Sequence, residues 1–406
     1  MLAFNPRDPA FIANPYPIYH QLRAAMPVWR APDGRVFLTR YDDAAMLVRD
    51  RRFGKGFKEP EALQRRFGPT AMEEPAVAEL SHMMLMQDPP DHTRLRGLVA
   101  KVFTARKMED MRPFIQRLTD QLIDKVEKSG EMDAVRDLAF PLPMLVICEL
   151  LGIPEEDRAH FVNGTASGGA LLNPVTPTRA ELDTANEGTR TSGAYFEKLF
   201  EARRREPRDD LLSLLVQAEE SGDRLTIEEL RANVTLLFAA GHETTVNLIG
   251  NGLWSLHNNP GQWAAIRDNP ALIPNAIEEI LRFESPVQLV GRVAAETIQF
   301  RGGEEVAAGS PIIALLGAAN RDPDEYPEPD RMDVTRERLR PLSFGGGIHF
   351  CIGAQLARIE AEVVFTTLLR RLPEITLPER TTPKWRDTFT LRGLTSLPAT
   401  WSTAKA

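Results

Sequence analysis

The chain has 406 residues, with 49 Lys or Arg against 57 Asp or Glu, so its formal net charge is −8. This balance argues against nucleic-acid binding, because phosphate contacts call for a basic surface. A hydrophobic content of 43% supports a sizeable core, and two cysteines are too few for a disulfide framework. The start lacks the pattern of a signal peptide, and no long apolar run follows. We expect one domain over 1–406, a cytoplasmic monomer without a membrane anchor.

Short runs with strand character lie near both ends of the chain, and helical periodicity dominates between about 90 and 285. The strand candidates lie at 28–30, 36–40, 296–300 and 311–316. Asp33-Gly34, between the first two candidates, is typical of a hairpin turn. The sequence therefore predicts a mainly α fold with small β-sheets.

Two segments of the helical region differ in composition. The run 143–151 is apolar and contains Cys148, which we expect to be an inert core residue. The segment 163–190 is rich in Gly, Thr and Asn, so we interpret it as a connection between helices. A long connection of this kind is a candidate lid.

One long helix is predicted from a capping box at 226–229 to His257, a length of roughly 45 Å at 1.5 Å per residue. Its centre, 234–241, is apolar on every face, which indicates burial. Glu243 and Thr244 follow at once, and such polar side chains are costly in a core without partners. Taken alone, the pair has an ordinary interpretation, because polar side chains in a helix are usually solvated or locally satisfied.

Two further pairs share a helix face and have ordinary interpretations when taken alone. Glu279 and Arg282 are spaced i to i+3 and resemble a surface ion pair. His92 and Arg96 are spaced i to i+4 and would form a solvated basic face. Neither pair identifies a function by itself.

Cys351 lies in the glycine-rich run 344–353, directly before a predicted helix that starts at 354. The free amides of a helix start would lower the pKa of the thiol, and glycines permit close approach of the backbone to a flat ligand. Zinc would need four nitrogen or sulfur ligands, and no CxxC pair is present. The remaining alternatives are a core cysteine and a thiolate ligand of a metal cofactor.

The spacing Phe344-x-x-Gly347-x-His349-x-Cys351-x-Gly353 resembles the haem loop of the cytochrome P450 superfamily, in its bacterial type. The resemblance implies the P450 fold and haem b (iron protoporphyrin IX), with Cys351 as the axial iron ligand. It also places Phe344, Gly345 and Gly353 beside the cofactor and His349 at a haem propionate. The spacing is highly specific, and it strongly disfavours the interpretation of Cys351 as a core residue.

The segment Ala240-Gly241-His242-Glu243-Thr244-Thr245 resembles the oxygen-activation motif of the same family. By resemblance, Ala240 and Gly241 lie beside the haem, Thr244 hydrogen-bonds the oxygen being cleaved, and Glu243 relays protons from solvent. Many members carry aspartate where this chain has Glu243. The longer side chain keeps the acid but extends its reach.

The other pairs also resemble family features once the haem loop is recognised. His92, Arg96 and Arg292 resemble cations that bind the propionates, together with His349. Glu279 and Arg282 resemble the ExxR signature. The resemblance makes Arg331 the third member of that structural set, although Met332 stands where phenylalanine is common.

The resemblance implies a monooxygenase that uses O₂ and takes electrons from NAD(P)H through a ferredoxin and a ferredoxin reductase. A basic docking patch for that partner is one interpretation of Arg336, Arg338, Arg340 and Arg358. A peroxygenase driven by H₂O₂ is an alternative, but such members usually lack the acid and threonine pair. A haem protein that binds a ligand without turnover is a third possibility, which matched NADPH consumption and product would exclude.

The substrate is predicted only by class. The segments expected to line a pocket are largely apolar, which favours a lipophilic small molecule that is hydroxylated or epoxidised. The pocket candidates are Met86, Phe238, Val287, Leu289, Val290 and Phe389.

Overall fold

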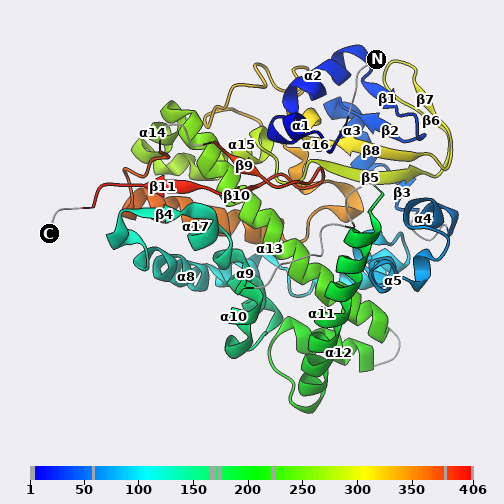
Figure 1. Cartoon of the computed structure of the whole chain (residues 1–406), viewed down its shortest axis with the longest axis horizontal. Helices are drawn as coiled ribbons and strands as arrows, with labels where there is room; N and C mark the ends of the chain where they lie inside the picture. The colour runs from blue at the N-terminus through cyan, green and yellow to red at the C-terminus, as the bar shows by residue number, and fades with distance from the viewer. Residues whose placement is uncertain are drawn as a thin grey trace. The chain divides into compact units, whose positions relative to one another are not determined.

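The computed structural model describes residues 5–56, 60–163, 171, 176–220, 225–378 and 382–403. Helices dominate these residues, and the strands are short (Figure 1). The prediction of a mainly α fold with small sheets is therefore confirmed. No helix in these ranges is both long and apolar enough to cross a membrane.

The helices are α1 (Pro9–Ala13), α2 (Tyr16–Ala25), α3 (Tyr41–Arg49), α4 (Pro60–Phe67), α5 (Pro75–His82), α6 (Asp91–Val99), α7 (Ala105–Asp110), α8 (Arg112–Asp124), α9 (Pro141–Leu151), α10 (Glu155–Asn163), α11 (Arg179–Arg205), α12 (Leu211–Glu220), α13 (Ile227–Asn258), α14 (Pro260–Asp268), α15 (Ile273–Phe283), α16 (Leu316–Ala319) and α17 (Ala354–Arg371). The strands are β1 (Val28–Arg30), β2 (Val36–Leu38), β3 (Phe53–Gly54), β4 (Glu131–Asp133), β5 (Leu289–Ala294), β6 (Ile298–Gln299), β7 (Glu305–Val306), β8 (Pro311–Leu315), β9 (Lys384–Trp385), β10 (Leu394–Ser396) and β11 (Pro398–Thr400).

The chain groups into two compact units. The first unit comprises Met1–Phe53, Met108–Pro143 and Glu243–Ala406, and the second comprises Gly54–Lys107 and Met144–His242. The chain passes from the second unit to the first inside α13. The single domain over 1–406 stays a prediction.

A five-stranded sheet of order β1-β2-β8-β5-β3 forms the main β region, and Figure 1 shows its strands side by side. β1 and β2 form the predicted hairpin, in which Trp29 pairs with Phe37 and Gly34 has a φ of +86°. Successive residues of a strand face opposite sides. Accordingly Ile312 packs in one core cluster and Ile313 in another, so this sheet is buried on both faces.

Helix α13 starts at the predicted capping box. The Glu229 amide donates to Thr226 Oγ1 (3.2 Å), and the Thr226 amide donates to Glu229 Oε2 (3.0 Å). The helix then runs for 32 residues, which corresponds to about 48 Å. Within the predicted apolar centre 234–241, Val234, Leu236 and Leu237 are buried, whereas Ala240 is exposed, so the predicted burial on every face holds only in part.

The prediction of a connection over 163–190 extends too far along the chain. Thr178 caps α11 and Glu181 completes a capping box with it, so the residues from Arg179 onward are helical. Local capping chemistry therefore overrides the Gly- and Thr-rich composition. The candidate lid falls mainly on 164–170 and 172–175, which lie outside the described residues.

Candidate active site

The loop that carries Cys351 is held by its own backbone and by α3. The Cys351 amide donates to the Phe344 carbonyl (3.0 Å), and Gly353 is the N-cap residue of α17. Gly347 has a φ of +60°, and a Cβ there would lie 2.5 Å from the Val48 carbonyl oxygen. Glycine is therefore required at this turn both by conformation and by space.

The two cysteines occupy opposite environments, which argues against the core alternative for Cys351. Cys148 is fully buried in α9, and burial raises the pKa of its thiol to about 12. Cys351 is exposed at the N-terminal end of α17. The prediction for Cys148 is confirmed, and Cys351 is not a core residue.

The donor set around Cys351 fits haem better than a bare metal ion. Within the described ranges, no three His, Cys, Asp or Glu side chains gather to hold a metal. A metal at Cys351 must therefore bring most of its ligands with it, as the porphyrin of haem does. Gly346 and Gly347 of the loop pack closely against Val48 and Arg49 of α3.

An aromatic and cationic contact supports the start of the loop. The Phe344 and Phe350 rings meet edge to face at 6.3 Å, and the Arg358 guanidinium lies 4.6 Å from the centre of the Phe344 ring. Arg358 in turn pairs with Glu278 of α15 at 2.5 Å. Phe344 is thus fixed between a ring and a cation that is itself neutralised.

The ExxR pair is a buried bidentate pair. Both side chains are 0% exposed, with Arg282 Nε 2.7 Å from Glu279 Oε2 and Arg282 Nη2 2.8 Å from Glu279 Oε1. Arg282 also donates to the carbonyls of Asn320 and Pro329, at 3.1 and 2.8 Å. Such additional acceptors are what a buried charge needs to offset its desolvation.

The third cation of this set differs from the sequence prediction. Arg331 is 59% exposed, pairs with Glu328 and reaches Arg282 only through its carbonyl. Arg336 is 12% exposed, lies 3.6 Å from Glu279 and donates to three carbonyls. Because Arg336 takes the place predicted for Arg331 beside Glu279, it does not belong to the predicted docking patch. The sequence did not identify Arg336, because Arg331 and Arg336 lie five residues apart in an irregular segment and their spacing does not show which side chain turns inward.

Polar residues that the sequence did not single out join this pair to the cysteine loop. Ser343 Oγ donates to the Leu281 carbonyl (2.6 Å), and Asn320 Nδ2 donates to Ser343 Oγ (2.9 Å). The Leu342 amide donates to Asn320 Oδ1 (2.8 Å). The residues just before Phe344 are therefore hydrogen-bonded to α15 directly and through Asn320. Since Arg282 also binds the Asn320 carbonyl, the Glu279–Arg282 pair helps to position the cysteine loop.

Glu243 has an arginine partner far along the sequence. Arg386 Nη1, beyond β9, lies 3.5 Å from Glu243 Oε1. Burial raises the pKa of Glu243, and the positive charge of Arg386 opposes that rise. No local pattern could have identified Arg386, because its partner lies more than a hundred residues earlier.

The predicted haem-contacting residues are divided between the two units. The first unit holds Cys351, Phe344, Gly345, His349, Gly353, Arg292, Glu243 and Thr244, and the second holds His92, Arg96, Ala240 and Gly241. Arg292 is buried on β5, and His92 is buried on α6. A solvated basic face therefore does not describe His92, while the haem contacts themselves stay predictions.

The pocket candidates are placed in several environments. Leu289 and Phe389 lie in a core cluster with Phe11, whose ring is 5.6 Å from that of Phe389. Val290 packs on the other cluster, together with Val287. Adjacent residues of β5 thus face opposite sides, so Leu289 and Val290 do not share one wall. In the second unit, Phe238 contacts the Phe196 ring and Met86 packs on the local core.

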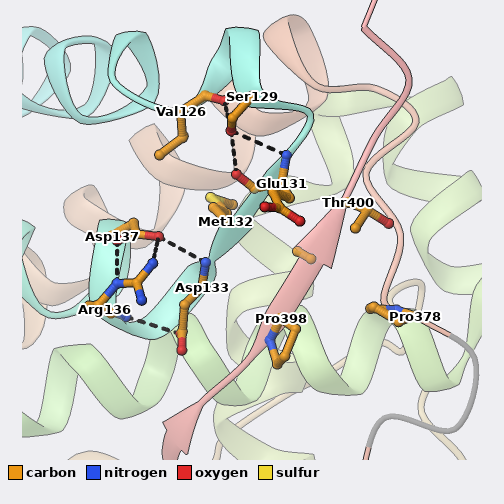
Figure 2. Close-up of a pocket in the computed structure, with 11 residues that line it drawn as sticks. Val126, Ser129, Glu131, Met132, Asp133, Arg136, Asp137, Pro378, Pro398 and Thr400 are labelled. Atoms are coloured by element: carbon orange, nitrogen blue, oxygen red, sulfur yellow. Dashed lines mark hydrogen bonds and ion pairs between the residues drawn. The ribbon is translucent and has the colours of Figure 1, made fainter.

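A cavity of about 460 Å³ is lined by residues of the paired strands β4 and β11 and of neighbouring segments of the first unit (Figure 2). Asp137, one of its acidic residues, has partners within the chain, because it accepts a hydrogen bond from the Asp133 amide (2.8 Å) and pairs with Arg136 (2.7 Å). None of the predicted site residues lines this cavity. It is therefore a feature separate from the candidate site.

Comparisons with known proteins identify the family. The cytochrome P450 family model matches residues 186–401. The vitamin D(3) 25-hydroxylase of Pseudonocardia autotrophica is 42% identical over 396 residues, covering 96% of this chain and 94% of that protein. The fold is similar to that of cytochrome P450 PksS of the Bacillus subtilis 168 bacillaene polyketide synthase (TM-score 0.86, 36% identity, covering 99% of this chain and 100% of that one). It is also similar to the myxobacterial cytochrome P450 CYP267B1 in complex with myristic acid (TM-score 0.88, 42% identity, 98% of each chain). The chain therefore belongs to the cytochrome P450 family and is a haem b monooxygenase.

Proposed function

We propose that this monooxygenase inserts one oxygen atom from O₂ into a lipophilic small molecule, by hydroxylation or epoxidation. Support comes from the relatives, of which one is a vitamin D(3) 25-hydroxylase and another was solved with myristic acid. Both ligands named there are lipophilic small molecules, the class that the sequence predicts. The proposal includes the roles that the family resemblance implies for the individual site residues.

Cys351 is the residue that carries the proposal, because it is exposed at the end of a glycine loop and at the start of α17. Bound haem supplies the iron at which O₂ is reduced and cleaved. Thr244 would donate a hydrogen bond to that oxygen, and Glu243 would pass protons to it from solvent. His92, Arg96, Arg292 and His349 would bind the propionates through charge-assisted hydrogen bonds.

Electrons would come from NAD(P)H through a ferredoxin and its reductase. Of the four arginines predicted to dock this partner, Arg336 is packed against the ExxR pair and Arg358 is neutralised by Glu278. Arg338 and Arg340 are exposed and are the remaining candidates. Replacing both with Gln should slow reduction most at low ionic strength; an unchanged rate would remove this docking surface.

The function is tested by a binding screen followed by turnover. Lipophilic compounds that shift the ferric haem spectrum are given to the enzyme with ferredoxin, reductase and NADPH. We expect oxygenated product in step with NADPH consumption. Product formed only with added H₂O₂ would contradict the proposal in favour of a peroxygenase, and binding without product would favour a non-catalytic haem protein.

A further inference from the structure

Arg386 and Glu243 form an ion pair between two distant parts of the first unit. Their closest charged atoms are 3.5 Å apart, and the side chains are 28% and 18% exposed. Glu243 belongs to α13, whereas Arg386 follows β9 in the C-terminal hairpin. The pair therefore joins the predicted proton relay to a segment that the oxygen-activation motif does not include.

The hairpin segment is seated on α13 one turn beyond Glu243. The Arg386 amide donates to the Gly393 carbonyl (2.9 Å), which closes the segment 386–393. Gly393 is pressed against Asn247, because a Cβ at position 393 would lie 1.8 Å from Asn247 Oδ1. Residues four apart on a helix are neighbours on one face, so Asn247 adjoins Glu243. The seat of Gly393 thus fixes where Arg386 stands.

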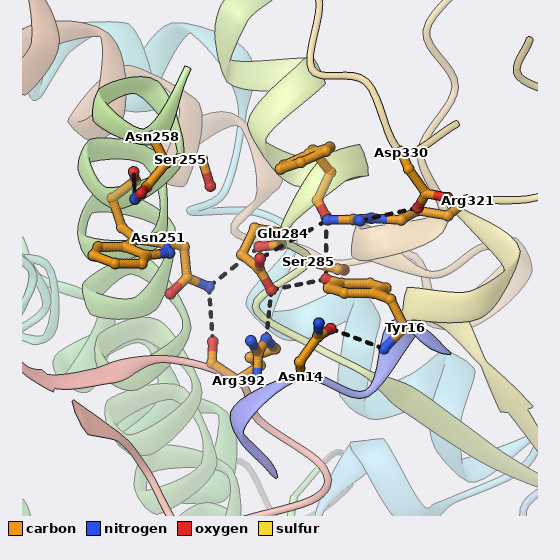
Figure 3. Close-up of polar contacts among 12 residues, drawn as sticks. Asn14, Tyr16, Asn251, Ser255, Asn258, Glu284, Ser285, Arg321, Asp330 and Arg392 are labelled. Carbon is orange, nitrogen blue, oxygen red and sulfur yellow. Dashed lines mark hydrogen bonds and ion pairs between the residues drawn. The ribbon is translucent and has the colours of Figure 1, made fainter. Parts of the chain in front are cut away.

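The next turn of α13 anchors the same segment again. Asn251 Nδ2 donates to the Arg392 carbonyl at 2.9 Å and to the Glu284 carbonyl at 3.2 Å (Figure 3). The Arg392 side chain pairs with Glu284 and lies 3.6 Å from the centre of the Trp385 ring. Arg386 therefore extends from a rigid support, although its own contact with Glu243 is a single long one.

The surroundings make Glu243 sensitive to this one cation. Burial disfavours the ionised carboxylate and raises the pKa of Glu243, whereas Arg386 favours the ionised form. Among the residues the structure describes, Arg386 is the charged group that shifts the pKa of Glu243. Removing its charge should leave burial unopposed and move the titration of Glu243 to higher pH.

We propose that Arg386 is the positioning residue of the proton relay: its guanidinium holds the Glu243 carboxylate in place beside Thr244. The inference rests on the proposed role of Glu243 as the proton-passing acid. Arg386 itself touches neither substrate nor cofactor in this scheme. Arg386 affects the relay only by positioning Glu243. The contact of Gly393 with Asn247 contributes by positioning Arg386.

The test follows the Glu243 carboxyl by infrared titration of the resting holoenzyme, with Glu243→Gln spectra subtracted. In Arg386→Gln the titration should move to higher pH and more electrons should be lost as peroxide at neutral pH. Arg386→Lys should lie closer to wild type because it keeps the charge. The matched control is Arg267→Gln, which removes an exposed arginine of α14 in the same unit and should change neither readout.

A second variant tests the seat without touching the charge. In Gly393→Ala the added methyl group would meet Asn247, so Arg386 should be displaced and the titration should move in the same direction. A wild-type titration and wild-type peroxide release in Arg386→Gln would overturn the inference. Wild-type turnover in Glu243→Gln would instead overturn the proposed role of Glu243.

Discussion

Two Glu–Arg pairs of the first unit differ in almost every physical respect. Glu279 and Arg282 are one helical turn apart, 0% exposed and bidentate, and further carbonyls satisfy the arginine. Glu243 and Arg386 come from distant segments, remain partly exposed and share one 3.5 Å contact. The first arrangement fixes a geometry, whereas the second leaves a carboxylate able to change its charge. Burial and geometry, more than residue type, separate the scaffold pair from the proposed relay pair.

The largest effect is expected on breaking the scaffold pair. Glu279→Gln leaves the buried Arg282 charge without its carboxylate, and this should lower the free energy of unfolding by about 3–5 kcal/mol. Urea denaturation of the holoenzyme measures the change. Arg386→Gln, which breaks the partly exposed pair, should cost no more than about 1 kcal/mol. Equal losses in the two variants would remove the distinction between scaffold and relay.

A medium effect should separate the two arginines near the scaffold pair. Arg336→Ala removes donors to three carbonyls and a cation near Glu279, so a loss of about 1–3 kcal/mol is expected. Arg331→Ala removes an exposed pair with Glu328 and should cost about 0–1 kcal/mol. The reverse order in denaturation experiments would restore Arg331 as the third member of the set.

The smallest effect concerns a buried carboxyl that pairs with no arginine among the residues the structure describes. Glu360 of α17 is 1% exposed, and burial raises its pKa well above the usual value. A folded-state pKa above the unfolded value stabilises the fold at low pH, and this contribution is lost as pH rises toward the folded-state pKa. Glu360→Gln should therefore match wild type in acid and exceed it by about 1 kcal/mol at alkaline pH. Parallel stability curves across pH would contradict this assignment.

Local patterns predicted the parts of the site that local physics determines. The Cys351 loop, the Thr226 cap and the Glu279–Arg282 spacing each depend on residues a few positions apart, and the structure has all three. The connection predicted over 163–190 is shorter in the structure, because the capping box of Thr178 and Glu181 starts α11 inside that segment.

The remaining site features depend on tertiary contacts. Arg336 replaces Arg331 because the irregular segment after Pro329 turns the later arginine inward, which spacing does not reveal. Arg386 reaches Glu243 from a distant segment in which Gly393 packs closely against Asn247. Likewise, the opposite orientation of Leu289 and Val290 follows from strand β5, whereas the sequence placed both in one pocket.

The central claim is that Cys351 supplies the thiolate of a haem monooxygenase. Its most direct test is the absorption spectrum of the reduced carbon monoxide complex for Cys351→Ser, with Cys148→Ser as the matched control. We predict that Cys148→Ser keeps the thiolate band and that Cys351→Ser loses it together with oxygenase activity. A thiolate band that persists in Cys351→Ser would contradict the account.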